Sequence, residues 1–307
     1  MVMEMNIIIY SNELKHRWEY HELRRYIIRT NNTYYKFVPI EEINIYIDNS
    51  TIRFYIDDKL LNVNDINLIF ILDLGKLSRH NLLYRIGILE YLQNKGIKII
   101  NSPNVLLLSK NKLLTYFRLV NSGIPIIPTM ALSSVNYDKI AFKKLLPNPI
   151  VKPIARGGGI NVRRLLNNSN IEIEKTIQEF LSESDIPLFQ KFINKKDNCD
   201  IRVFVCGYRV LAAMKRCSEP GQVVTNISRG GKPMRVKLNK HIRELAVSTA
   251  KLIKGEIITV DIIEDNNGHL YVLEVNGYPR WKGLQQVTDF NIVEKIIDYL
   301  NRTAKGG

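Results

Sequence analysis

The chain has 307 residues, enough for about two structural units with one or two hydrophobic cores. Hydrophobic residues make up 45% and charged residues 24%, as in ordinary globular proteins, which argues against a disordered tail, a collagen-like repeat or a membrane bundle. The longest apolar runs, such as 68–72, have the length of strands, so we expect no membrane span. Because residues 1–5 lack the features of a signal peptide, we expect a cytoplasmic protein.

The chain is basic, with 44 lysine and arginine residues against 30 aspartate and glutamate residues and a net charge of +14. A basic surface can bind along the phosphates of a nucleic acid, or it can attract a small polyanion such as a nucleotide or a phosphorylated coenzyme. The basic residues are not gathered into a block with interleaved aromatics, and no zinc-finger, basic-zipper or RNP-type motif occurs. The spread charge therefore favours a weak steering role toward a small anionic ligand over nucleic-acid binding.

The first third of the sequence alternates strand and helix patterns. Strands are predicted at 7–10, 68–72 and 97–100, and a helix with leucine and isoleucine on one face precedes Gly96, which ends it. Strands rich in tyrosine and isoleucine also fall between about 32 and 60. This alternation predicts an open α/β layer of parallel strands covered by helices.

The rest of the chain begins with a junction at 101–103 and a helix that opens at 109, has its apolar residues on one face and ends at Gly123. A glycine loop is predicted at 157–159. Further strands are predicted at 149–152, 201–205, 210–214, 258–263 and 270–275, with helices at 171–181, 240–253 and 291–301. The three cysteines, Cys199, Cys206 and Cys217, lack zinc or redox spacing and are predicted to be small buried apolar residues.

Two of these strands form a predicted hairpin with polar residues on one face. The turn 265–268 is rich in residues typical of hairpins, so 259–263 and 270–276 should pair antiparallel. Glu274 and Asn276 then share a face, with Asp261 as a cross-strand neighbour. Such an all-oxygen site suits Mg²⁺ between protein and substrate phosphates, whereas the alternative is a solvated polar face.

Two further groups of residues could bind anions. Lys152 lies at the end of a strand, just before the glycine loop. The backbone N–H groups of such a loop and the charge of a lysine can bind phosphate. The alternative is a mobile surface loop, which three glycines alone more often form. Asp200 and Arg202 share a strand face, and an arginine fork suits a carboxylate or phosphoryl group. The alternative is a structural Asp200–Arg202 ion pair with solvated basic residues around it.

In this order, the motifs resemble the ATP-grasp superfamily and its RimK-like amino-acid ligases. The resemblance covers about residues 100 to 300. It is carried by Ser109-Lys-Asn-Lys112, Val151-Lys152, Phe189-Gln-Lys-Phe-Ile193, Cys199-Asp-Ile-Arg202, Ala212-Ala-Met-Lys-Arg216, Asn226-Ile-Ser-Arg-Gly-Gly231, Val260-Asp-Ile262 and Leu273-Glu-Val-Asn276. It implies an α/β ATP-grasp fold, with an N-terminal domain over 1–103 and two α+β subdomains over 104–188 and 189–307 that enclose the nucleotide.

The resemblance also implies a role for each matching residue. Lys112 and Lys152 would contact ATP phosphates, Gln190, Lys191 and Phe192 would border the nucleotide at its adenine, and Asp200 would complete the pocket near the ribose. Asp261, Glu274 and Asn276 match the ligands of Mg²⁺ or Mn²⁺, with two ions expected. Arg216 matches the catalytic arginine that stabilises charge at the acyl phosphate. Asn226 is a candidate nucleotide contact, and Arg202 and Arg229 are candidate substrate contacts.

The segment after Asn276 departs from RimK itself, since Gly277-Tyr-Pro-Arg-Trp-Lys-Gly-Leu284 replaces a small residue, proline and glycine. Tyr278 and Arg280 could present an aromatic and a basic group to a bulky anionic acceptor, or they could belong to a packed turn. The segment resembles archaeal relatives that add L-glutamate to tetrahydromethanopterin, with the deazaflavin coenzyme as a close alternative.

Three hypotheses follow for function. The first is an ATP- and Mg²⁺-dependent ligase that adds L-glutamate to a small anionic coenzyme, and the second is the same chemistry on a protein tail or carrier protein. The third is a non-catalytic basic protein that binds nucleic acid on a ligase fold. The resemblance also implies a homo-oligomer, a dimer or a tetramer.

Overall fold

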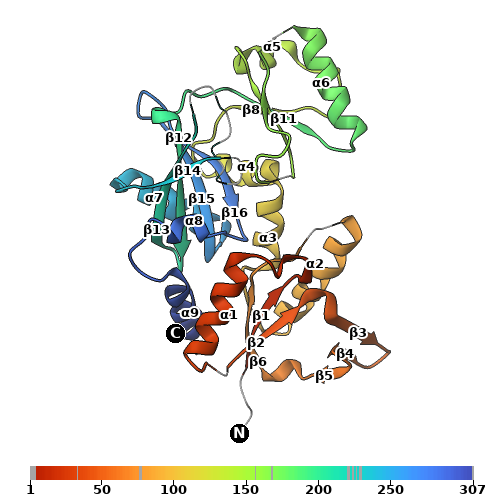
Figure 1. The fold of residues 1–307 in the computed structure, drawn as a ribbon. Coiled ribbons are helices and arrows are strands. Elements are labelled where there is room, and N and C mark those ends of the chain that lie inside the picture. The colour runs from red at the N-terminus through yellow and green to blue at the C-terminus, as the bar shows by residue number, and fades with distance from the viewer. Residues whose placement is uncertain are drawn as a thin grey trace. The chain divides into compact units, whose positions relative to one another are not determined.

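The computed structural model describes residues 5–32, 34–75, 78–155, 157–166, 169–219, 222, 225, 227 and 230–305, and helices and sheets are mixed throughout (Figure 1). The chain divides into two compact units. Unit 1 comprises Met1–Leu106, Gly255–Ile257 and Tyr278–Gly307, and unit 2 comprises Leu107–Lys254 and Ile258–Gly277. The finer division into 1–103, 104–188 and 189–307 stays a prediction.

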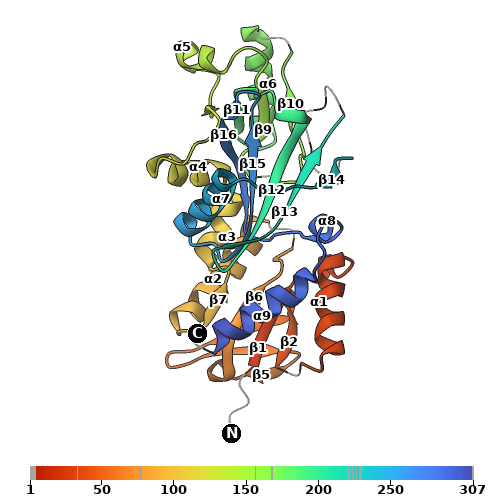
Figure 2. The same cartoon turned by 90° about the vertical axis from the view of Figure 1, so that its left-hand side faces the viewer.

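Unit 1 contains the parallel sheet that the sequence predicts. Its strands follow the order β2-β1-β6-β7, with β1 at Met5–Tyr10, β2 at Tyr35–Pro39, β6 at Ile66–Ile71 and β7 at Lys98–Ile100. The helices are α1 at Trp18–Arg29, α2 at Arg79–Asn94, α8 at Lys282–Gln285 and α9 at Ile292–Ala304. Helix α9 packs against β6 and α1 (Figure 2), which helps to explain why the central strands are apolar on both faces.

The tyrosine- and isoleucine-rich region of unit 1 forms a separate antiparallel sheet, β3-β4-β5. Its strands are Ile43–Ile47, Ile52–Ile56 and Lys59–Leu61. Asp57 and Asp58 connect the last two strands with positive φ angles of 50° and 58°, the conformation that a two-residue hairpin turn requires.

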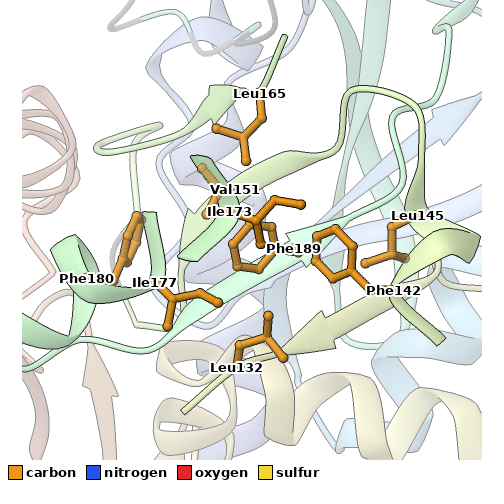
Figure 3. Packing of buried hydrophobic residues seen from close by; sticks show 9 residues of the cluster. All are labelled: Leu132, Phe142, Leu145, Val151, Leu165, Ile173, Ile177, Phe180 and Phe189. Atoms are coloured by element: carbon orange, nitrogen blue, oxygen red, sulfur yellow. The ribbon is translucent and has the colours of Figure 1, made fainter. Parts of the chain in front are cut away.

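The first sheet of unit 2 is antiparallel and follows the order β10-β9-β11-β8. Its strands are β8 at Thr129–Ala131, β9 at Ile150–Pro153, β10 at Arg163–Arg164 and β11 at Pro187–Gln190, accompanied by α5 at Lys139–Phe142 and α6 at Asn170–Ser182. Figure 3 shows the apolar core of this sheet, in which Phe189 and Phe142 lie with ring centroids 5.2 Å apart. The core fixes β11 and β9, which carry polar residues on their opposite sides.

The second sheet of unit 2 follows the order β14-β13-β12-β15-β16. Its strands are β12 at Cys199–Cys206, β13 at Arg209–Cys217, β14 at Lys232–Arg235, β15 at Ile257–Glu264 and β16 at Leu270–Asn276, and the nearby helices are α3 at Pro103–Lys110, α4 at Lys112–Asn121 and α7 at Lys240–Ile253. Helix α7 packs against β12 and β13. The predicted hairpin is confirmed, since β15 and β16 pair antiparallel with Asp261 opposite Glu274.

The prediction for the cysteines is wrong for two of the three. Cys199 and Cys217 form a disulfide, whereas Cys206 is half-buried and is not part of a disulfide. The two bonded residues lie directly opposite each other in the β12–β13 register, so strand pairing brings their side chains together although 18 positions separate them in sequence. Among the described helices, none is long and apolar enough to cross a membrane.

Candidate functional site

Unit 2 contains a cavity of about 100 Å³ that is lined by residues of both of its sheets. The residues that the sequence predicts for nucleotide and metal binding mostly meet there: Lys112, Lys152, Gln190, Lys191, Phe192, Asp200, Arg216, Asp261 and Glu274. Gly157, Gly158 and Gly159 also line the cavity. The loop is therefore placed where its backbone N–H groups could approach a ligand.

Two lysines, the buried Lys152 and the half-buried Lys112, supply positive charge on one part of the cavity wall. Lys152 Nζ donates hydrogen bonds of 2.9 Å to the hydroxyl of Tyr116 and to Oε1 of Gln190, and burial lowers the pKa of Lys152 to about 8. Lys112, at the first position of α4, lies with Nζ 3.8 Å from Oε1 of Glu274. Burial also lowers the pKa of Lys112, which the charge of Glu274 partly offsets. Both ammonium groups therefore have protein partners at the cavity wall.

Arg216 is the centre of a buried ion-pair network. Its Nε and Nη2 donate to the two carboxylate oxygens of Asp200 at 2.7 Å each, and Nη2 also donates to Oδ2 of Asp261 at 2.9 Å. Thr225 Oγ1 donates to Oδ2 of Asp200 at 2.6 Å. Burial acts to lower the pKa of Arg216, but the two carboxylates raise it further above its ordinary value. Arg216 therefore stays charged.

Arg202 holds Asp261 from the neighbouring strand. Its Nε and Nη2 donate to the two oxygens of Asp261 at 2.8 and 2.7 Å. Burial alone would raise the pKa of Asp261, but Arg202 and Arg216 together lower it to about 2. The Asp200–Arg202 pair considered from the sequence is not formed, because Asp200 pairs with Arg216 on the facing strand and Arg202 pairs with Asp261.

The hairpin donors fit a hard divalent cation in their chemistry. Asp261 and Glu274 face each other across β15 and β16, and Asn276 lies two residues after Glu274 on the same face. The amide Nδ2 of Asn276 is buried and has no hydrogen-bond partner among the described residues, and the oxygen of the same amide is the atom that could bind a cation. The described residues contain no group of three histidine, cysteine, aspartate or glutamate side chains suited to a metal. A cation here would therefore need the Asn276 amide or substrate oxygens beside the two carboxylates.

The residues that follow the end of β11 at Gln190 border the same cavity. Lys191 is exposed, and Phe192 is half-buried with the Arg164 guanidinium stacked 3.7 Å from its ring centroid. Lys195, which is not among the residues predicted from the sequence, also lines the cavity. Burial lowers the pKa of Lys195, while Asp200 acts to raise it. The Lys195–Lys196 pair shortly before a strand was the available signal, but such pairs usually mark a solvated surface.

The remaining predicted residues lie elsewhere. Asn226 and Arg229 fall outside the described residues, as does Arg156. Tyr278 and Arg280 belong to unit 1, where they line a second pocket.

Comparison with protein families matches residues 109–300 to a RimK-like ATP-grasp domain. The chain is 31% identical over 223 residues to a probable alpha-L-glutamate ligase of Legionella pneumophila (strain Corby), covering 72% of this chain and 73% of that protein. It is 27% identical over 297 residues to tetrahydromethanopterin:alpha-L-glutamate ligase of Methanococcus maripaludis, covering 96% and 95% of the two chains.

Solved structures show the same fold. The ATP-grasp ligase PsnB complexed with minimal precursor has a TM-score of 0.74 to this chain at 16% identity, covering 98% of this chain and 99% of that one. PsnB complexed with minimal precursor, Mg and ADP has a TM-score of 0.72 at 16% identity, covering 97% of each chain. The expected α/β ATP-grasp fold is confirmed.

Proposed function

Because the chain belongs to the RimK-like ATP-grasp family and is an ATP-grasp glutamate ligase, we propose that it adds L-glutamate to a small anionic coenzyme, tetrahydromethanopterin, with ATP and Mg²⁺. The relative that bears this name is similar over 96% of the chain, including the first hundred residues that the family match omits. The deazaflavin coenzyme and a protein tail are the alternative acceptors.

One observation carries the proposal for the chemistry. Within a single cavity, Lys112 and Lys152 lie with the carboxylates of the β15–β16 hairpin, and Arg216 lies beside them. Cations of this kind neutralise phosphate oxygens, and paired carboxylates suit a divalent cation that bridges protein and phosphate. A protein that only bound nucleic acid would have no use for a buried site of this composition.

The proposed reaction has two steps. A carboxylate oxygen of the acceptor attacks the γ-phosphorus of ATP, which forms an acyl phosphate and releases ADP. The amine nitrogen of L-glutamate then attacks the acyl carbon, phosphate leaves with the C–O bonding electrons, and the nitrogen loses a proton. One amide bond forms, and one phosphoanhydride bond is consumed.

The residues of the chain have distinct parts in these steps. Lys112 and Lys152 bind the phosphates, and Gln190 holds Lys152 in place through its Oε1 atom. Asp200 is a positioning residue, because its two bonds fix the plane of the Arg216 guanidinium. Arg216 stabilises the negative charge that develops on the phosphorylated carboxyl group. Mg²⁺, held by Asp261, Glu274 and Asn276, would neutralise phosphate charge during transfer.

The decisive test measures phosphate release from ATP with Mg²⁺, L-glutamate and each acceptor in turn, together with the product mass. We expect tetrahydromethanopterin to gain one glutamyl unit. Glu274→Gln should lower turnover by about a hundredfold or more, since it removes a charged ligand of the cation. Glu264→Gln, in the same strand pair but engaged with Lys196 at 2.7 Å, is the matched control and should keep activity.

Other outcomes separate the alternatives. If the deazaflavin coenzyme or a polypeptide is modified instead, tetrahydromethanopterin is not the acceptor, but the proposed ligase reaction still holds. The ligase proposal is wrong if no acceptor is modified, the protein binds nucleic acid tightly in a salt-sensitive way, and Glu274→Gln does not change that binding.

A further inference from the structure

A second pocket lies in unit 1, at the carboxyl ends of the parallel strands. Tyr10 is the last residue of β1, and Leu72 and Asp73 directly follow β6. In the strand order β2-β1-β6-β7, the chain runs outward from β1 to β2 on one side and from β6 to β7 on the other. The crevice between β1 and β6 is therefore the topological switch point of this sheet, the place where open α/β sheets bind ligands.

Two arginines from distant parts of the chain line this pocket. Arg17 precedes helix α1 and donates to Oδ2 of Asp73, whereas Arg280 lies in the third segment of unit 1 and is exposed. Burial lowers the pKa of Arg17, and the positive charge of Arg280 lowers it further, against the effect of Asp73. No ion pair involving Arg280 is found within the described part of the chain. The two guanidinium groups thus repel each other across a space that an anion could fill.

The acidic residues of the pocket are already engaged. Glu19 Oε1 accepts hydrogen bonds from the backbone N–H groups of Trp281 and Lys282, at 3.1 and 3.2 Å. Asp73 Oδ1 accepts from the N–H of Gly75 at 2.7 Å, and its other oxygen pairs with Arg17. Glu19 therefore anchors the segment that carries Arg280, and both carboxylates are satisfied without the charge of that arginine.

Aromatic side chains complete the wall. Tyr10 and Tyr20 lie with ring centroids 4.7 Å apart, both are buried, and Tyr278 lines the same pocket. The free space is about 10 Å³, which is roughly the room that one water-sized group needs. This space suits the end of an oxyanion and is too small for a whole coenzyme.

We propose that this pocket binds one carboxylate group of an acidic substrate between Arg17 and Arg280. The proposal rests on the proposed function, because both L-glutamate and an anionic acceptor can supply such a group. Arg280 is the specificity-determining residue, since Arg17 is shared with Asp73 and Arg280 is not. An arginine fork suits a planar carboxylate through two parallel hydrogen bonds.

The test measures initial rates on the full chain while L-glutamate, the acceptor and ATP are varied in turn. Arg280→Gln removes the charge from an exposed side chain, so the fold should be kept. We expect the KM of one acidic substrate to rise by about tenfold to a hundredfold, as for loss of a charged hydrogen bond, and the KM of ATP to stay the same. The substrate whose KM rises identifies the source of the carboxylate. Arg302→Gln, an exposed arginine of α9 in the same unit, is the matched control.

A binding titration separates this proposal from the proposed function. Glutarate, a simple dicarboxylate, is titrated by calorimetry into the protein without ATP. We expect glutarate to bind the unsubstituted chain and Arg302→Gln equally well, and to bind Arg280→Gln more weakly. This result supports carboxylate binding in the pocket even if no acceptor is turned over. Equal KM values in Arg280→Gln and the control, or glutarate binding that is absent or unaffected by Arg280→Gln, would overturn the proposal.

Discussion

Asp200 and Arg216 face each other across strands β12 and β13 and form a two-bond ion pair, with both N–O distances 2.7 Å and both residues almost fully buried. The pair is flanked on β12–β13 by the Cys199–Cys217 disulfide and reaches Asp261 through Nη2 of Arg216. The position of the arginine is therefore set by strand register and not by a flexible side chain.

Asp200→Asn should be strongly destabilising, because it leaves Arg216 buried with only one of its two carboxylate partners. We expect the free energy of unfolding to fall by about 3 kcal/mol or more, and turnover to fall as well. Urea denaturation followed by circular dichroism measures the first effect. Asp197→Asn is the control, since that carboxylate pairs with Lys215 at the surface and its loss should leave stability nearly unchanged. Equal stability of the two variants would contradict the role of the buried pair.

Nucleotide affinity should depend on the protonation of Lys152. Its pKa of about 8 means that the ammonium charge is lost in the free protein as pH rises through 8, whereas bound phosphates require the charge. Affinity for ADP should therefore fall by up to about tenfold per pH unit above this point. Lys152→Met should bind ADP more weakly below pH 8 and show a flatter pH profile, whereas Lys139→Met, at an exposed position of helix α5, should follow the unsubstituted chain.

The same pKa shift has a consequence for stability with the opposite sign. Between about pH 8 and the ordinary lysine pKa of 10.5, the unfolded chain retains a proton that folded Lys152 has released. The contribution of Lys152 to the free energy of unfolding therefore rises with pH in this window. Comparing urea unfolding of the unsubstituted chain and Lys152→Met across the window checks this, and a contribution that stayed constant with pH would show that Lys152 keeps its charge when folded.

Reduction of the Cys199–Cys217 disulfide should destabilise unit 2. The two cysteines are 18 positions apart, and closing a loop of this size restricts the unfolded chain by about 3 kcal/mol. Urea unfolding with and without a thiol reductant should show a difference of this order. Cys206→Ala should retain the response to reductant, whereas Cys217→Ala should abolish it. A response that persists in Cys217→Ala would mean that reductant acts elsewhere.

The core of the first sheet of unit 2 should be sensitive to Phe189. This side chain is fully buried and packs against Phe142, so Phe189→Ala should cost about 3 to 5 kcal/mol through lost burial and the cavity left behind. Nucleotide affinity should also fall, because the next residue, Gln190, holds Lys152. Phe117→Ala is the control, since that ring is 56% exposed on α4. A similar loss in both variants would contradict this account of the core.

The sequence by itself determined features that depend on neighbours along the chain. The β15–β16 hairpin follows from a turn-rich segment between two apolar runs, and the alternation of side chains then places Glu274 and Asn276 on one face. The parallel sheet of unit 1 follows from the repeated strand and helix patterns, since each pattern depends on a period within a few residues.

Only the tertiary structure decided which distant residues meet. The helix that opens near 109 shows an apolar face, yet Phe117 and Val120 are exposed while Tyr116 is buried and holds Lys152, because packing partners and not periodicity select the buried face. The pairing of Asp200 with Arg216, and the disulfide beside it, depend on a strand register that a one-residue shift would change. Likewise, Arg17 and Arg280 are 263 positions apart, and only the folding of unit 1 gives them a common pocket.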